Sequence, residues 1–162
     1  VGWKAIDNIA SLIHLSRDKS IPIIYVAHDT IPKGSKGWIP KKISRKTSES
    51  LAKNADIVKE IAPVEGDIVI YKTRSSMLYG TYLLATLIGL GVDTLLICGT
   101  ATGGCVRASV VDAHNNNFRV MVIEECTFDR APLTHKVNLF EMNAKNCDVI
   151  TMAEAKEYIG NL

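Results

Sequence analysis

The sequence predicts an α/β domain with three layers, in which a mostly parallel sheet lies between two layers of helices. Three observations support this: apolar, β-branched runs alternate with helical patterns, the runs are short, and they are apolar at nearly every position. Such strands are buried on both faces, as in a parallel sheet covered by helices on both sides. The expected strands are residues 21–27, 67–71, 94–99, 119–123 and, more weakly, 148–150.

Helical patterns fill the intervals between these strands. The expected helices are residues 3–19, 80–90, 104–117, 133–145 and 153–160. Apolar residues three and four positions apart share one face of a helix, and that face is expected to meet the sheet. The side chains expected on these faces are Trp3, Ile6, Ala10 and Ile13 in the first helix, Val106, Val110 and Ala113 in the third, and Leu139 and Met142 in the fourth.

Length and charge narrow the class of protein. The 162 residues are expected to form a single domain spanning residues 1–162, because domains usually hold about 100–200 residues. The net charge of +2 is too small to indicate a nucleic-acid or membrane-surface partner. The four cysteines show no CxxC pair and no zinc-finger spacing, which predicts a reduced, cytoplasmic protein. Cys98 and Cys126 fall within or beside strands and are expected in the core.

The segment 29–50 differs from the rest of the chain. It carries six Lys or Arg residues against Asp29 and Glu49, with Trp38 near its middle. We interpret it as a long surface loop, either a solvated excursion or a lid or subunit contact whose positive field attracts an anionic substrate.

Chemically active side chains follow the expected strands. In an open parallel sheet, ligands bind beyond the carboxyl ends of the strands, so these residues are expected on one rim. They are His28 and Asp29 after the first strand, residues 72–76 after the second, residues 99–105 after the third, and Glu124, Glu125, Asp129 and Arg130 after the fourth.

Cys105 is the candidate nucleophile of this rim. It lies where a Gly-rich turn enters a helix, and the helix dipole favours a thiolate there. Lys72 would lower the thiol pKa further, and the N–H groups of the turn could stabilise an oxyanion. The alternative is that Cys105 is a small buried apolar residue. His28 and His135 are interpreted as hydrogen-bonded structural histidines.

Two segments resemble the motifs of a known family. Residues 72–76 read Lys-Thr-Arg-Ser-Ser ahead of Gly80-Thr81, and residues 102–109 read Thr-Gly-Gly-Cys-Val-Arg-Ala-Ser. Together they resemble the isochorismatase-like cysteine hydrolases, whose fold is a Rossmann-like α/β/α domain. Residues 111–113, 129–130 and 135–145 look most like the N-carbamoylsarcosine amidase and maleamate amidase branch.

The resemblance implies a cysteine amidohydrolase that needs no cofactor or metal. It implies that Cys105 attacks the carbonyl carbon and that Lys72 holds the thiolate and helps to move protons. The backbone N–H groups of Ala101 and Cys105 would form the oxyanion hole, with a cis peptide at Thr100-Ala101, and Arg130 would grip a substrate carboxylate. The expected substrate is a small anionic amide or carbamoyl compound, similar to N-carbamoylsarcosine, cleaved through a thioester with release of ammonia. Because family members commonly assemble, a homodimer or homotetramer is expected.

One catalytic group of the resembled family has no counterpart in this sequence. The family places an aspartate on a first strand, whereas Asp7 falls in the first expected helix and Asp29 follows a different strand. We therefore expect the first strand of the fold to lie upstream of Val1. Two alternatives remain: a non-catalytic binding or scaffold member of the fold, and a nicotinamidase-type enzyme, for which His28 and Asp29 alone do not make a metal site.

Overall fold

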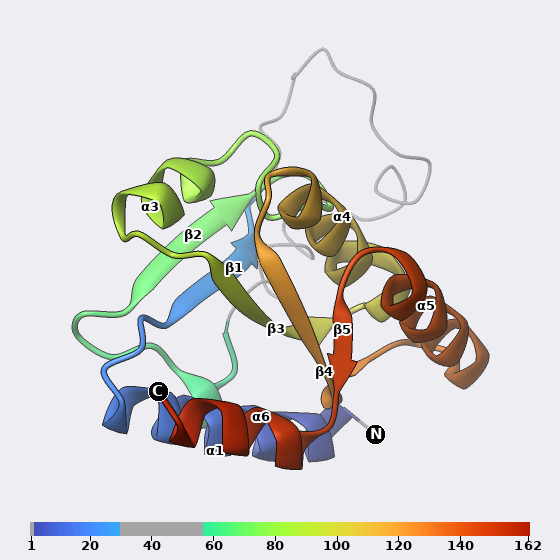
Figure 1. Cartoon of the computed structure of the whole chain (residues 1–162), viewed down its shortest axis with the longest axis horizontal. Helices are drawn as coiled ribbons and strands as arrows, with labels where there is room; N and C mark the ends of the chain where they lie inside the picture. Colours follow the sequence, from blue (N-terminus) through green and yellow to red (C-terminus); the bar gives the residue numbers. More distant parts are fainter. Residues whose placement is uncertain (1, 30–56) are drawn as a thin grey trace.

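The computed structural model describes residues 2–29 and 57–162, and its strands and helices alternate as predicted (Figure 1). The expected basic loop lies, except for Asp29, outside the described residues, and so does Trp38. The strands are β1 (Ile24–His28), β2 (Ile68–Lys72), β3 (Thr94–Thr100), β4 (Arg119–Phe128) and β5 (Asp148–Ile150). The helices are α1 (Gly2–Asp18), α3 (Leu83–Gly89), α4 (Arg107–Asn115), α5 (Pro132–Lys145) and α6 (Met152–Gly160), with the short turns η1 (Lys59–Ile61) and η2 (Thr102–Val106).

All the strand pairs among the described residues are parallel, which confirms the predicted sheet type. The described strands form two sheets, one of order β1-β2 and one of order β3-β4-β5. In the smaller sheet the register runs from Ile24 opposite Ile68 to His28 opposite Lys72. The last residues of β1 and β2 are therefore direct neighbours.

Helices cover both faces of the β3-β4-β5 sheet, which gives the three predicted layers (Figure 1). On one face, Val120 and Val122 of β4 join a core with residues of α3, α4 and α5. On the other face, Ile123 packs with Leu12 of α1 and Ile159 of α6. Burial on both faces explains why β4 is apolar at consecutive positions. No helix among the described residues is long and apolar enough to cross a bilayer.

The buried face of α1 differs from the predicted one. Ala5, Leu12 and Ser16 are its buried residues, whereas the Trp3 side chain is 67% exposed. The helix is rotated so that Leu12 reaches the core shared with β4 and α6. An apolar stripe that includes an aromatic residue was therefore a poor guide to the face that meets the sheet.

β4 continues past its predicted end at Ile123 to Phe128. A bulge interrupts its pairing with β3, since Ile97 lies opposite Val122 but Gly99 lies opposite Thr127. The expectation that Glu124 and Glu125 follow the end of the strand is wrong, because both lie within β4. Glu125 accepts a hydrogen bond from the backbone N–H of Met152 (2.9 Å) at the start of α6.

Candidate active site

Three chemically active side chains converge from the carboxyl ends of three strands. His28 ends β1, Lys72 ends β2, and Cys105 lies in η2, just beyond β3. Opposed residues of a parallel pair point to the same face, so the register of the smaller sheet sets the His28 and Lys72 side chains side by side. The backbone N–H of Asp29 donates to the Lys72 carbonyl (2.9 Å), which extends this pairing past the strand end.

The Cys105 thiol contacts an imidazole. Its Sγ atom lies 3.6 Å from Nε2 of His28, a hydrogen-bond distance for sulfur. Cys105 is half-buried, and His28 is exposed at the strand end. The imidazole therefore has one nitrogen at the thiol while the residue remains open to solvent.

Lys72 is fixed beside the same thiol. Only 5% of the residue is exposed, and its Nζ donates to the carbonyls of Arg74 (2.9 Å) and Ser75 (2.8 Å). A buried ammonium must have its donors satisfied, and it has three. The Lys72 ammonium also interacts with the Cys105 thiol.

The surroundings of Cys105 favour its thiolate. The hydrogen bond from His28 is the largest influence and lowers the thiol pKa, burial raises it, and the charge and hydrogen bond of Lys72 lower it again. The net result is a pKa of about 7, so a large part of the thiol is ionised at neutral pH. A thiolate is the nucleophilic form of cysteine.

The turn that carries Cys105 is π-helical and leads directly into α4. Its first residue, Thr102, is fully buried, and its hydroxyl is hydrogen-bonded to Nδ1 of His135 (2.8 Å). The backbone N–H of Gly103 donates to the Asp129 carboxylate (2.7 Å). The second carboxylate oxygen of Asp129 accepts from the N–H of Arg130 (2.7 Å). Asp129 thus ties the end of β4 to the turn.

Helix α5 also packs directly against the turn. A Cβ atom on Gly103 would lie 2.5 Å from Nδ2 of Asn138, so only glycine fits without a shift. The buried Asn138 is itself held, because its Oδ1 accepts from Arg107 (2.8 Å) and its Nδ2 donates to the Thr134 carbonyl (2.8 Å). The position of Cys105 therefore depends on packing against α5.

One predicted feature of the site is present in the structure, whereas the roles of three residues remain predictions. The peptide bond between Thr100 and Ala101 is cis, at the position that the resemblance indicates. Arg130 is exposed, and the contact it makes in the described residues is through its backbone N–H. Its grip on a substrate and the oxyanion role of the Ala101 and Cys105 N–H groups stay predictions.

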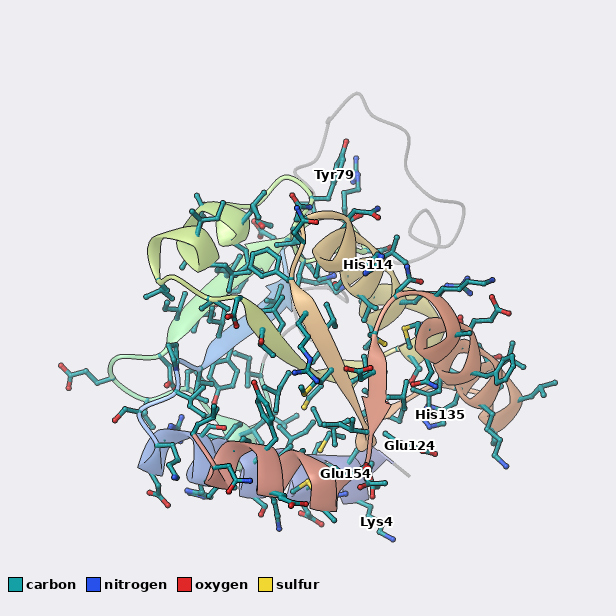
Figure 2. All side chains as sticks on the ribbon, in the orientation of Figure 1. Lys4, Tyr79, His114, Glu124, His135 and Glu154 are labelled. Atoms are coloured by element: carbon teal, nitrogen blue, oxygen red, sulfur yellow. The ribbon has the colours of Figure 1, made fainter. Side chains whose placement is uncertain are left out.

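The two histidines have different hydrogen-bond partners. His135, on α5 (Figure 2), is hydrogen-bonded to Thr102, as expected of a structural histidine. His28 is hydrogen-bonded as well, but its partner is the Cys105 thiol, so it lies in the candidate site. Only its place at the carboxyl end of a strand could have pointed to the site, since no local motif surrounds it.

The other cysteines lack this environment. Cys98, Cys126 and Cys147 are free thiols, and Cys126 is fully buried. Burial raises the pKa of Cys147 to about 11, with a further contribution from Asp148. Among residues 2–29 and 57–162, no group of three or more His, Cys, Asp or Glu side chains could hold a metal ion.

Comparison with known proteins assigns the family. The isochorismatase domain matches residues 3–154, so the chain belongs to the isochorismatase family of hydrolases. Maleamate amidohydrolase of Pseudomonas putida is 33% identical over 98% of this chain and 76% of that protein. N-carbamoylsarcosine amidase of Arthrobacter is 30% identical over 97% of this chain, which spans only 62% of that relative.

Solved structures agree with the fold. A cysteine hydrolase from Pseudomonas syringae superposes with a TM-score of 0.91 at 20% identity, over 99% of this chain and 82% of that one. N-carbamoylsarcosine amidase from Thermoplasma acidophilum gives a TM-score of 0.76 at 25% identity, over 91% and 83% of the two chains. The predicted α/β/α class is thereby confirmed.

Proposed function

We propose that this protein is a cysteine-dependent amidohydrolase that cleaves a small amide or carbamoyl compound bearing a carboxylate. Cys105 attacks the carbonyl carbon, ammonia leaves, and water hydrolyses the resulting thioester. The names of two relatives, a maleamate amidohydrolase and an N-carbamoylsarcosine amidase, support this class of substrate. Both names denote carboxylates that carry an amide or carbamoyl nitrogen.

The convergence of His28 and Lys72 on the Cys105 thiol, which lowers the thiol pKa to about 7, carries the proposal. This environment requires three strand ends to meet, whereas burial raises the pKa of Cys147 to about 11. Since an ordinary thiol has a pKa near ~8.5, this environment raises the thiolate fraction at neutral pH from a few per cent to a large share.

The remaining roles follow from position. The N–H group of Ala101 directly precedes the turn and that of Cys105 lies within it, and we assign to them the developing oxyanion. Arg130 follows Asp129, which is hydrogen-bonded to that turn, so its guanidinium can reach a carboxylate bound there. We also propose that the protein acts in the cytoplasm, where thiols stay reduced, as a homodimer or homotetramer.

Ammonia release tests the proposal. Maleamate and N-carbamoylsarcosine are incubated with the protein, with Cys105→Ser and with Cys147→Ser as a matched control. We expect release by the native protein and the control, and none by Cys105→Ser. A thioester adduct on the Cys105 peptide, trapped by acid and seen by mass spectrometry, would accompany turnover. Undiminished release by Cys105→Ser would refute the mechanism.

A further inference from the structure

We propose that Asp129 is a positioning residue that fixes the spacing between Cys105 and Arg130, and that this spacing selects amides by the distance from their amide carbon to their carboxylate. The inference rests on the proposed function, because it takes Cys105 as the nucleophile and Arg130 as the residue that binds the carboxylate. It goes beyond that function because it names what sets the length of the substrate.

The Asp129 carboxylate joins the two segments that would hold the substrate. Its Oδ2 atom accepts the backbone N–H of Gly103 (2.7 Å), which lies two residues before Cys105 in η2. Its Oδ1 atom accepts the backbone N–H of Arg130 (2.7 Å). Hydrogen bonds to an ionised acceptor are shorter and stronger than those between neutral groups. One charged group therefore connects the turn of the nucleophile to the backbone of the carboxylate-binding residue.

The connection from β4 to α5 is short, so the backbone of Arg130 has little freedom of its own. Only residues 129–131 separate the strand from the helix, and α5 begins at Pro132. Proline fixes its own φ angle and favours an extended conformation in the residue before it, and Ala131 is extended (φ −121°, ψ 130°). The backbone of Arg130 thus lies between two fixed points, the Asp129 carboxylate and the first turn of α5.

Helix α5 is itself attached to η2. Nδ1 of His135, on α5 (Figure 2), is hydrogen-bonded to the Thr102 hydroxyl (2.8 Å), and side chains of α5 also pack against Gly103. The segment 129–131 is therefore tied to η2 at both ends, by Asp129 at its start and by α5 after its end. Loss of the Asp129 carboxylate would release the first attachment and leave the second in place.

The role of Asp129 is separate from the activation of the thiol. The contacts that lower the pKa of Cys105 come from His28 and Lys72. Both residues belong to the smaller sheet, whereas Asp129 follows β4. We therefore expect substitution of Asp129 to leave the thiol pKa at about 7 while Arg130 loses its fixed position. This difference distinguishes a positioning role from a general loss of the site.

A series of saturated amide acids of increasing length tests this role. Malonamate, succinamate and glutaramate place one, two and three carbons between the amide carbon and the carboxylate, and succinamate has the spacing of maleamate. Ammonia release gives kcat/KM for each acid. Asp129→Asn keeps the size of the side chain but leaves a single acceptor oxygen. Asp148→Asn, which removes the same charge from an exposed pair with Arg119, is the matched control.

We expect the native protein to prefer succinamate over both neighbours by ~10²-fold, since a misplacement of ~1 Å can cost that much in rate. Asp129→Asn should reduce this preference at least ~10-fold, the effect of losing one hydrogen bond to a charged group. Alkylation of Cys105 in this variant should still titrate at about 7. Asp148→Asn should match the native protein in all of these measurements.

A double variant tests whether Asp129 acts through Arg130. Arg130→Ala already removes the group that binds the carboxylate, so adding Asp129→Asn should change the length preference no further. The role of Asp129 is overturned if Asp129→Asn keeps the native preference, if it slows all three acids equally, or if it still changes the preference of Arg130→Ala. Should Asp129→Asn not fold, Asp129→Glu displaces the same carboxylate by one methylene. Its length preference should also differ from the native one, and a native preference would contradict the role.

Failure of the proposed function gives a different result. If the native protein releases no ammonia from this series, from maleamate or from N-carbamoylsarcosine, the amidase proposal fails and the role of Asp129 fails with it. If the native protein releases ammonia but shows no preference for one length, the amidase proposal stands and the role of Asp129 alone is refuted.

Discussion

Replacing Gly103 with alanine should distort the site, because the added Cβ atom would clash with side chains of α5. The added Cβ atom would lie 2.5 Å from Nδ2 and 3.0 Å from Cγ of Asn138, and 3.0 Å from Cγ2 of Thr134. Asn138 cannot move freely, since it holds hydrogen bonds to both Arg107 and Thr134. Either Asn138 gives up these bonds, or the turn that carries Cys105 shifts.

The expected loss of stability follows from the first case, in which Asn138 gives up its two hydrogen bonds. A lost hydrogen bond to a charged partner such as Arg107 costs ~1.5–3 kcal/mol, and a neutral one such as that to the Thr134 carbonyl costs ~0.5–1.5 kcal/mol. Together they predict a decrease of ~2–4.5 kcal/mol in the free energy of unfolding. If the turn moves instead, the free energy of unfolding falls less, but Cys105 moves away from His28 and the pKa of the Cys105 thiol rises.

Gly104→Ala is the matched control in the same turn. Its Cβ atom would meet only the Ala101 Cβ at 3.7 Å, an ordinary contact, and alanine is a better helix former than glycine by up to ~1 kcal/mol. Urea denaturation and the alkylation pKa of Cys105 are measured for both variants. Removing the obstruction in Gly103→Ala/Asn138→Ala should give coupling between the two changes. Native stability together with a native Cys105 pKa in Gly103→Ala would refute this reasoning.

Two further predictions concern the substrate and the fold. Arg130→Ala should raise KM for carboxylate-bearing amides, whereas Arg119→Ala, whose guanidinium pairs with Asp148 at 3.4 Å, should not; an unchanged KM would remove Arg130 from substrate binding. Thr151 caps α6, and its backbone N–H and hydroxyl lower the pKa of Glu154 below 4.5. Ionised Glu154 therefore stabilises the fold above that pH, and its contribution is lost as the pH falls through the lowered pKa. Glu154→Gln should lower Tm at neutral pH, and the decrease should shrink as the pH falls below 4.5; a decrease that does not change with pH would contradict this.

Most of the fold could be predicted because the local sequence of a strand shows whether that strand is buried. Consecutive apolar residues such as Val120–Ile123 indicate a strand covered on both faces, and β4 is such a strand. The rotation of α1 could not be predicted, since the stripe containing Trp3 and the buried stripe containing Leu12 are both apolar. The end of β4 was missed because a bulge lets polar residues continue the strand.

Part of the candidate site could also be predicted from local sequence patterns. Cys105 and Lys72 lie in segments with recognisable spacing, and the rule that ligands bind at carboxyl strand ends brings them to one rim. His28 has no neighbouring motif, and its significance depends on two tertiary facts: its register with Lys72 and the path of η2 back toward β1. Contacts between distant segments of this kind are not encoded in local patterns.

The central claim is that Cys105 is an activated thiolate, and the pH dependence of alkylation tests it most directly. The native protein is treated with iodoacetamide over a range of pH, and each cysteine is followed through its own peptide by mass spectrometry. We predict an apparent pKa of about 7 for Cys105 and of about 11 for Cys147, an internal reference in the same molecule. Titration of Cys105 at or above ~8.5, the value of a free thiol, would contradict the account.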